Sequence, residues 1–351
     1  MLPISVCIIA KNEEKHIEEC LKRLKPYHYE IVLVDTGSTD RTLDIATRYT
    51  DSVYHFDWTD DFSAAKNYAI DKASNDWILS IDCDEYVEGI DEPALQKLMT
   101  QLPQNAGRIL IRNRLTENGQ VSFEQVRVTR FFNRKFFHFE GAIHEQVEYR
   151  DNTILSKSVF PAPITVLHVG YDGTEEEMHA KSLRNIALLK RELEQTGPDA
   201  YLYYQLAQSC MKLKDYQKAY EWFNLGLSMD VNPKLDYVQA MVTSYGYCLL
   251  AMKRYEEALQ LLNIYDVFAV TADFVFLMGL IYMNNALFSE AIEEFQKCTT
   301  MEQFSTEGIN SYRAFYNIGV ICECTGHKEE ARKYYQKCGD YEMAKVRLRE
   351  M

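Results

Sequence analysis

Residues 4–10 read Ile-Ser-Val-Cys-Ile-Ile-Ala, a nearly continuous apolar run. A run of this kind is typical of a strand that is buried on both faces of a parallel sheet. Three further strands are expected at 30–35 (EIVLVD), 52–56 (SVYHF) and 77–82 (WILSID). Because amphipathic stretches separate the four strands, the pattern predicts an open α/β sheet with right-handed crossovers.

The stretches between these strands are expected to be helices, and further strands are expected to follow them. The expected helices cover 12–25, the residues after Asp40 through Arg48, and 62–74. Later strand-like segments lie at 108–114, 121–133 and 163–169, without strong helices between them. We expect these later segments to form a mixed or antiparallel edge of the sheet.

The strand signal stops near Glu175. Residues 175–195 form a strongly helical segment that ends at Gly197-Pro198, and four similar units follow. Each unit has an alanine, a small residue twelve positions before it and a large apolar residue four positions after it. The alanines are Ala219, Ala258, Ala291 and Ala331, the small residues are Ala207, Gly246, Gly279 and Gly319, and the large residues are Phe223, Leu262, Phe295 and Tyr335. This spacing predicts helix-turn-helix tetratricopeptide repeats, in which small residues stand where two helices touch.

The two patterns divide the chain. We expect a first domain over 1–172, a connecting helix over 173–197 and a repeat domain over 198–351. The chain has 351 residues, 38 basic and 52 acidic, and its net charge of −14 argues against nucleic acid as a partner. We expect neither a transmembrane segment nor a signal peptide. The nine scattered cysteines are expected to be reduced thiols of a cytoplasmic protein.

Polar residues follow all four strands of the parallel pattern. They are Lys11-Asn12-Glu13, Asp35, the segment 57–61 and Asp82-Cys83-Asp84. In an open α/β sheet ligands bind beyond the carboxyl ends of the strands, so we expect these residues to lie at one edge. Neither GxGxxG nor GxxxxGK[ST] occurs, which disfavours dinucleotide binding and P-loop phosphoryl transfer.

Asp82 and Asp84 are the most specific of these polar residues. Two carboxylates at this spacing can converge on a hard divalent cation and leave positions for water and phosphate oxygens. They can equally cap a strand end as acidic turn residues, and spacing alone does not decide between the two. Asp35 has a similar alternative, because with Ser38 and Asp40 it can form an Asx turn and a helix N-cap.

Four segments, in this order, resemble the family-2 glycosyltransferases with the GT-A fold. They are 5–21 (SVCIIAKNEEKHIEECL), 30–46 (EIVLVDTGSTDRTLDIA), 62–70 (FSAAKNYAI) and 77–87 (WILSIDCDEYV). The later segments 138–147 (HFEGAIHEQV) and 166–171 (VLHVGY), followed by a helix and repeats, resemble a narrower bacterial subgroup that includes the sublancin-type peptide S-glycosyltransferases. The resemblance implies an α/β GT-A domain, with a Rossmann-like mixed sheet, followed by an all-α domain of about four tetratricopeptide repeats.

The resemblance also implies a nucleotide-sugar site. The residues implied in binding the donor are Ala10, Asn12, Glu13, Asp35, Lys66 and Asp82. Asp35 would accept the N3–H of uracil. Lys66 stands where the family usually has arginine and would contact phosphate or ribose, although as a point charge and not as a bidentate fork. Asp84 would bind a divalent metal, Mn or Mg, on the diphosphate.

Two histidines and a glutamate complete the expected site. The resemblance implies a later histidine as an extra metal ligand, and we favour His168 over His144, since imidazole is compatible with Mn. His144 is then expected on the acceptor side. In inverting members a carboxylate deprotonates the acceptor, and we expect Glu145 to be that base. The structural alternatives are a histidine that is hydrogen-bonded in the core or exposed, and a surface glutamate that forms a salt bridge.

A local basic stretch lies between these motifs. Arg127, Arg130, Arg134 and Lys135 are interleaved with Phe131, Phe132, Phe136 and Phe137. Such a mixture is compatible with nucleic-acid binding, with a lid over a diphosphate or with an acceptor wall. The acidity of the chain favours the last two.

These interpretations predict a metal-dependent inverting glycosyltransferase. It would move a sugar from a nucleotide sugar, with UDP as the expected nucleotide, to a protein or peptide side chain held partly by the repeats. The alternatives are a cell-envelope saccharide as acceptor and a non-catalytic tetratricopeptide scaffold. The sequence leaves open the sugar, the acceptor residue and whether the protein forms a homo-oligomer.

Overall fold

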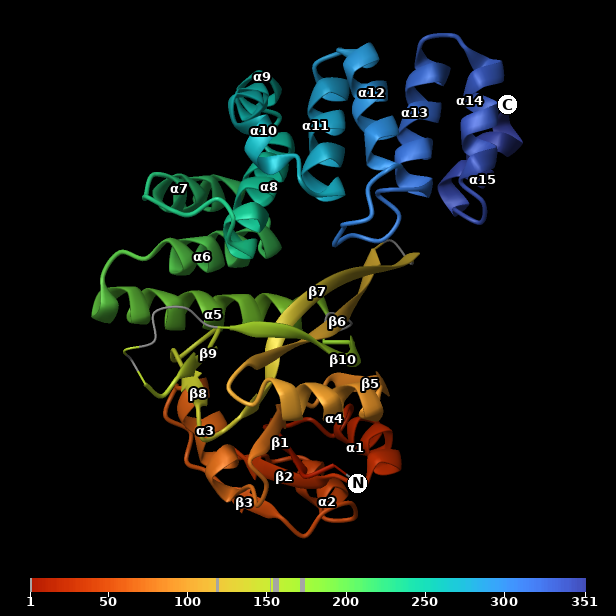
Figure 1. Cartoon of the computed structure of the whole chain (residues 1–351). Helices are drawn as coiled ribbons and strands as arrows, with labels where there is room; N and C mark the ends of the chain where they lie inside the picture. The colour runs from red at the N-terminus through yellow and green to blue at the C-terminus, as the bar shows by residue number, and fades with distance from the viewer. Residues whose placement is uncertain (1, 118–119, 152, 154–157, 171–173) are drawn as a thin grey trace. The chain divides into compact units, whose positions relative to one another are not determined.

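The computed structural model describes residues 2–117, 120–151, 153, 158–170 and 174–351 (Figure 1). The chain divides into two compact units, Met1–Met178 and His179–Met351. Tyr171 and the expected boundary between 172 and 173 lie outside the described residues. Within the described part of the chain, the helices are too short or too polar to cross a membrane.

An eight-stranded sheet forms the centre of the first unit, with the strand order β3-β2-β1-β4-β7-β6-β10-β5. The strands are β1 (Ile4–Ala10), β2 (Glu30–Asp35), β3 (Val53–His55), β4 (Trp77–Ser80), β5 (Glu85–Ile90), β6 (Ala106–Glu117), β7 (Gln120–Asn133) and β10 (Val159–His168). The first four are parallel, β7 joins β4 antiparallel, and β10 lies parallel to β6 and antiparallel to β5. The expected parallel half and mixed edge are therefore both confirmed. A separate two-stranded sheet pairs β8 (Phe137–Glu140) with β9 (Gln146–Tyr149).

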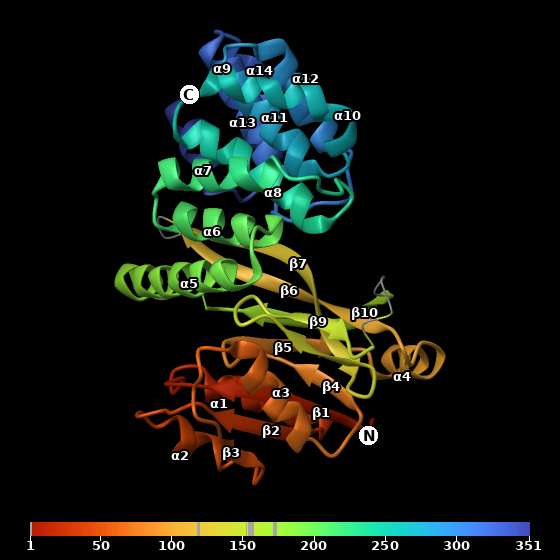
Figure 2. The same cartoon turned by 90° about the vertical axis from the view of Figure 1, so that its left-hand side faces the viewer.

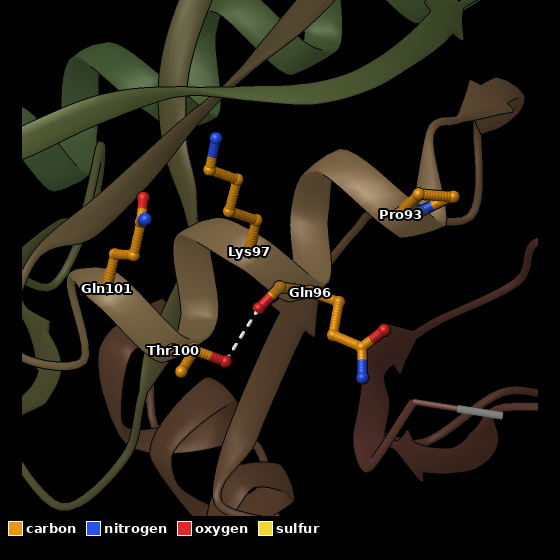
Figure 3. Close-up of a pocket in the computed structure, with 5 residues that line it drawn as sticks. All are labelled: Pro93, Gln96, Lys97, Thr100 and Gln101. Carbon is orange, nitrogen blue, oxygen red and sulfur yellow. Dashed lines mark hydrogen bonds between the residues drawn. The ribbon is translucent and has the colours of Figure 1, made fainter.

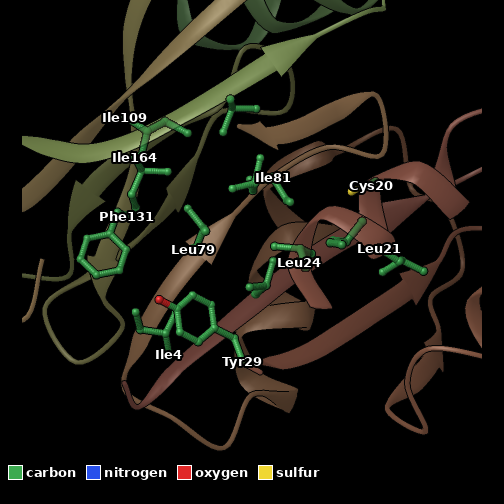
Figure 4. Close-up of a cluster of buried hydrophobic side chains, with 14 of the residues drawn as sticks. Ile4, Cys20, Leu21, Leu24, Tyr29, Leu79, Ile81, Ile109, Phe131 and Ile164 are labelled. Atoms are coloured by element: carbon green, nitrogen blue, oxygen red, sulfur yellow. The ribbon is translucent and has the colours of Figure 1, made fainter. Parts of the chain in front are cut away.

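Helices cover both faces of the parallel half. They are α1 (Ile17–Leu24), α2 (Thr42–Ala46), α3 (Phe62–Lys72) and α4 (Glu92–Gln101), with a short 3₁₀ turn η1 (Lys25–Tyr27) after α1. Along β1, Val6 and Ile8 belong to the cluster that α1 and α4 cover, whereas Cys7 packs with α3 on the other face. Figure 4 shows the first of these clusters, in which side chains from β1 and α1 meet Phe131, Ile109 and Ile164 of the mixed half. Burial on both faces is the reason that β1 is apolar along almost its whole length.

Two helices differ from the expectation. α1 begins at Ile17, five residues later than expected, because Asn12 has a φ of 57° and the residues after it form turns. α4 was missed, although its start carries local signals. The Asp91 side chain accepts the backbone N–H of Ala94, and Pro93 lies in the first turn, where its missing N–H costs nothing.

The second unit is helical, and its helices pack in successive pairs (Figure 2). They are α6 (Ala200–Lys212), α7 (Tyr216–Leu227), α8 (Asp236–Ala251), α9 (Tyr255–Ala258), η2 (Leu259–Ile264), α10 (Tyr265–Phe268), α11 (Ala272–Asn284), α12 (Phe288–Cys298), α13 (Tyr312–Cys324), α14 (Lys328–Lys337) and α15 (Glu342–Glu350). α5 (Glu175–Thr196) precedes them along the chain. All four marker alanines are fully buried. A β-carbon on Gly279 would lie 2.6 Å from Phe295 Cε1, which explains the small residue at that helix contact.

The second repeat is irregular, and the expectation that Leu262 is a core residue was wrong. Leu262 is 40% exposed, whereas its neighbour Leu261 is buried. Both lie in η2, a 3₁₀ segment that replaces the α-helix expected there. A 3₁₀ helix turns in three residues instead of 3.6, so the position that faces the core moves back along the sequence.

Candidate active site

The residues that follow β1 and β2 are joined by hydrogen bonds at the carboxyl edge of the sheet. Asn12 Oδ1 accepts the backbone N–H of Thr39 at 2.8 Å, and the backbone N–H of Asn12 donates to Ser38 Oγ at 3.0 Å. The backbone N–H of Glu13 donates to Thr42 Oγ1 at 2.7 Å. The predicted donor-binding residues Asn12 and Glu13 therefore lie beside the turn that follows β2.

Asp35 is buried at the end of β2 and forms the expected Asx turn. Its carboxylate accepts the backbone N–H groups of Gly37 at 3.0 Å and Ser38 at 3.1 Å. His55 Nδ1 lies 3.8 Å from Asp35 Oδ2, and the carbonyl of Ala10 accepts the backbone N–H of Thr36 at 2.9 Å. The turn uses only part of the acceptor capacity of a carboxylate, which has about four lone-pair positions.

A group of four charged side chains, here called the charge cluster, comes from four separate parts of the first unit. Its members are Lys66 on α3, Asp82 after β4, Arg130 on β7 and Glu145 before β9. Lys66 Nζ lies 2.6 Å from Glu145 Oε1 and 3.0 Å from Asp82 Oδ1. Arg130 Nη2 lies 3.2 Å from Asp82 Oδ2, and Arg130 Nη1 lies 3.7 Å from Glu145 Oε1. Two cations and two carboxylates thus alternate within contact distance.

Burial and pairing oppose each other in setting the pKa values of the cluster. Burial favours the neutral form of Asp82 and Glu145, but the positive charges of Lys66 and Arg130 outweigh it, so the pKa of both carboxyl groups lies below its usual value. At nearby Glu85 the charges of Arg130 and His168 compensate only in part. Burial and the charge of Asp82 raise the pKa of Glu85, whose carboxylate accepts the backbone N–H of Asp82 at 2.8 Å. Asp82 and Glu145 are therefore ionised at neutral pH.

Lys66 is only 5% exposed, and its ammonium group is held between the two carboxylates. This arrangement differs from the expected direct contact with phosphate or ribose. Asp82, in contrast, keeps 36% of its side chain exposed and can still meet a ligand. The Glu145 side chain is 10% exposed and forms a salt bridge with Lys66, whereas the structural alternative was a glutamate on the surface.

Asp84 and His168 form a second, adjacent pair. His168 Nε2 lies 3.4 Å from Asp84 Oδ2, and His168 Nδ1 lies 2.8 Å from Asn113 Oδ1. With Asn113 Oδ1 as acceptor, Nδ1 carries a proton, and Nε2 is the ring nitrogen that faces Asp84. Parallel pairing of β10 with β6 sets His168 opposite Asn113.

The pair fits the chemistry of a divalent cation. One carboxylate oxygen and one imidazole nitrogen suit an ion such as Mn²⁺, with its other positions open to water and phosphate oxygens. No group of three or more histidine, cysteine or acidic side chains that could hold a metal is found among the described residues. His144 lies elsewhere, in the connection between β8 and β9, where its φ is 53° and its carbonyl accepts an N–H of the Gln146 side chain.

Three side chains of this region were not predicted as site residues: Arg130, Asn113 and Glu85. Arg130 was recognised only as part of a basic stretch. Residues two apart in a strand lie on the same face, so Arg130 shares its face of β7 with Phe132, which is fully buried. The sequence could therefore have indicated that Arg130 points towards the interior. Asn113 and Glu85 have no comparable signal, because only the pairing of β10 with β6 and β5 brings them to His168.

A shallow surface depression lies elsewhere, along α4 (Figure 3). It is lined by Pro93, Gln96, Lys97, Thr100 and Gln101. Thr100 Oγ1 donates to the carbonyl of Gln96 at 2.9 Å. Its lining comes from a single helix and has one charged side chain, so it offers none of the chemistry of the sheet edge.

The fold is an open α/β domain with polar side chains at the carboxyl edge of its sheet, and helical repeats follow it along the chain. Residues 5–160 match the profile described as glycosyl transferase family 2. Residues 200–232, 272–304 and 312–340 match the tetratricopeptide repeat. The N-terminal part of the chain therefore belongs to glycosyl transferase family 2, and tetratricopeptide repeats follow it. The irregular segment from α9 to α10 lies between the first two repeat matches.

Relatives support this assignment. The chain is 33% identical over 277 residues to a TPR repeat-containing protein of Synechococcus elongatus, covering 74% of this chain and 66% of the relative. It is 29% identical over 195 residues to the SPbeta prophage-derived glycosyltransferase SunS of Bacillus subtilis, covering 54% and 45%. An uncharacterized glycosyltransferase of Rickettsia bellii is 28% identical over 189 residues, covering 51% and 63%. The matches thus span between 45% and 66% of the length of these relatives.

Replacing Lys66 with methionine tests the charge cluster. Loss of this cation leaves the buried Glu145 and the partly exposed Asp82 with Arg130 alone, so we expect the free energy of unfolding at pH 7 to fall by up to about 3 kcal/mol. The depressed pKa values of Asp82 and Glu145 mean that their stabilisation is present above their unfolded values near pH 4 and is lost as the pH falls through the lower folded values. The deficit of Lys66→Met should therefore shrink in acid.

Urea unfolding between pH 7 and pH 3 measures this deficit. Lys97→Met, on the exposed face of α4, is the matched control and should change stability by less than about 0.5 kcal/mol. A Lys66→Met deficit equal to that of the control, or one that stays constant with pH, would contradict the assignment of the cluster.

Proposed function

We propose that the protein is a metal-dependent inverting glycosyltransferase that moves a sugar from a UDP-linked donor to a protein or peptide side chain. The observation that carries the proposal is the arrangement at the carboxyl edge of the sheet. There the Asp84–His168 pair lies two residues from Asp82, whose exposed carboxylate joins the charge cluster. Membership of glycosyl transferase family 2 supports the reaction class.

Asp84 and His168 would hold the divalent cation on the diphosphate of the donor. When bound, such a cation neutralises the charge that develops on the leaving diphosphate as the glycosidic bond breaks. Asn113 would keep His168 in the tautomer that presents Nε2, because its Oδ1 would accept a hydrogen bond from Nδ1–H. Asn12, Glu13 and Asp35, with Ala10 beside them, would line the nucleoside end, where the hydrogen-bonded turns after β1 and β2 supply a rigid frame.

Glu145 would deprotonate the acceptor. Its carboxylate is ionised at neutral pH, which is the form that a general base needs. Because its pKa is lowered, it is a weak base, and its contribution would depend on exact placement beside the reacting atoms. We assign that placement to Lys66 and Arg130, which hold Glu145 next to Asp82. Lys66 would therefore act as a positioning residue and not as a ligand of the phosphate.

The second unit offers a place for the acceptor. A groove of about 390 Å³ lies between α5, α6 and α7, and its lining combines apolar side chains with basic ones and one aspartate. Its lining residues are His179, Leu183, Ile186, Lys190, Cys210, Leu213, Asp215, Lys218 and Trp222. Apolar pockets beside charged groups suit peptide segments better than the flat polar surface of a saccharide, which favours a peptide acceptor over a cell-envelope saccharide. A non-catalytic scaffold would have no need to keep Asp82, Asp84 and Asp35.

Nucleotide binding tests the donor site. We expect UDP to bind in the presence of Mn²⁺ more tightly than GDP or CDP, and Asp84→Ala to weaken this binding at least about tenfold, because one of two cation ligands is lost. Isothermal titration calorimetry with and without Mn²⁺ measures both effects. Asp71→Ala, which removes an exposed carboxylate of α3, is the control and should bind as the wild type does. If no nucleotide bound with or without Mn²⁺, the result would contradict the proposed donor site and favour the non-catalytic scaffold.

Glu145→Gln tests the base. Glutamine keeps the shape of the side chain but cannot take a proton, so we expect the hydrolysis of UDP-glucose or UDP-N-acetylglucosamine, with water as acceptor, to fall by about 10²–10⁴-fold. UDP binding should persist. Glu140→Gln on β8, whose carboxylate pairs with His138 at 2.7 Å, serves as control. Unchanged hydrolysis in Glu145→Gln would remove Glu145 as base, and thermal unfolding shows whether the lost pair with Lys66 has disturbed the fold.

A further inference from the structure

Gly170 lies two residues after His168, just beyond the end of β10. A β-carbon on Gly170 would lie 2.6 Å from His168 Nε2 and still closer to Asp84 Oδ2. Real β-carbons essentially never come within 3.0 Å of such atoms. With Asp84 and His168 in their observed places, no residue other than glycine fits at position 170.

Backbone conformation does not explain this glycine. Gly37 and Gly141 have φ values of 102° and 95°, which other residues rarely adopt, whereas Gly170 is not among the glycines with positive φ. Gly89 on β5 shows the opposite case, because a β-carbon there would meet nothing within 4 Å. The constraint at Gly170 is therefore one of space alone.

Both contacts are with the side-chain atoms that would ligate a cation. A β-carbon at position 170 would take the space next to these two atoms, so it would push Asp84 Oδ2 and His168 Nε2 out of their observed places. The two atoms are themselves 3.4 Å apart, which is compatible with two neighbouring ligands of one ion.

We propose that Gly170 allows Asp84 and His168 to converge as a pair of cation ligands, so that a methyl group at residue 170 separates the pair and weakens binding of the ion. The proposal rests on the proposed function, which requires the cation. It adds a third residue to the site, one that contributes no ligand atom and acts only through the volume that it leaves free. Alanine is compatible with the backbone at this position, so Gly170→Ala is expected to fold, with Asp84 rotated away from the new methyl group.

The test compares Mn²⁺ binding by the full-length wild type, Gly170→Ala and Gly89→Ala. Loss of the electron paramagnetic resonance signal of free Mn²⁺, measured with UDP present and corrected for Mn²⁺ bound to UDP alone, gives the affinity. The rise in unfolding temperature caused by Mn²⁺ gives a second readout that does not depend on activity. We expect Gly170→Ala to bind Mn²⁺ at least tenfold more weakly and to lose the rise, while Gly89→Ala retains both.

Each outcome bears on the proposal. Wild-type affinity in Gly170→Ala would overturn the role of Gly170 and leave the proposed function standing. Absence of Mn²⁺ binding in the wild type would overturn both. Where Gly170→Ala alone does not fold, the variant Asp84→Ala/Gly170→Ala decides, because removal of the Asp84 carboxylate relieves the collision. Recovery of folding in the double variant supports the assigned contact, and continued failure to fold overturns it.

Discussion

The pairing of buried charges at the carboxyl edge of the sheet is the constraint on which the rest of the first unit depends. A buried lysine or carboxylate is costly unless an opposite charge compensates it. Lys66 comes from α3, Asp82 from the end of β4, Arg130 from β7 and Glu145 from the segment before β9. The charges are compensated only when the parallel half, the antiparallel β7 and the small β8–β9 sheet are all in place. The site is therefore complete only when all of these parts of the first unit are folded.

Strand register then decides which polar side chains meet beside this cluster. β10 lies between β6 and β5, and its last residue, His168, stands opposite Asn113 on one side and Glu85 on the other. Glu85 directly follows Asp84, so the pairing also brings Asp84 to His168. A shift of one residue in β10 would turn His168 to the other face of the sheet and separate the pair.

The repeats depend on apolar packing between helices and not on paired charges. Each helix pair depends on a small residue at the helix contact and a large one that fills the space beside it, as Gly279 and Phe295 do. The second repeat keeps Ala258 buried but loses the regular helix after it. The alanine of a repeat can therefore be buried as expected while the large apolar residue four positions later, here Leu262, is exposed to solvent.

The sequence by itself determined the parallel strands, the mixed edge, the repeat markers and the gathering of Asp35, Asp82 and Asp84 at one edge, because periodicity and chain order are local properties. Tertiary structure alone decided that Lys66 is enclosed by carboxylates, that Asp82 and Glu145 are the partners of Arg130 and that Asn113 contacts His168. These facts depend on pairing between strands far apart in the chain, which no local pattern encodes. The need for glycine at position 170 likewise depends on tertiary structure, because it arises from the positions of Asp84 and His168.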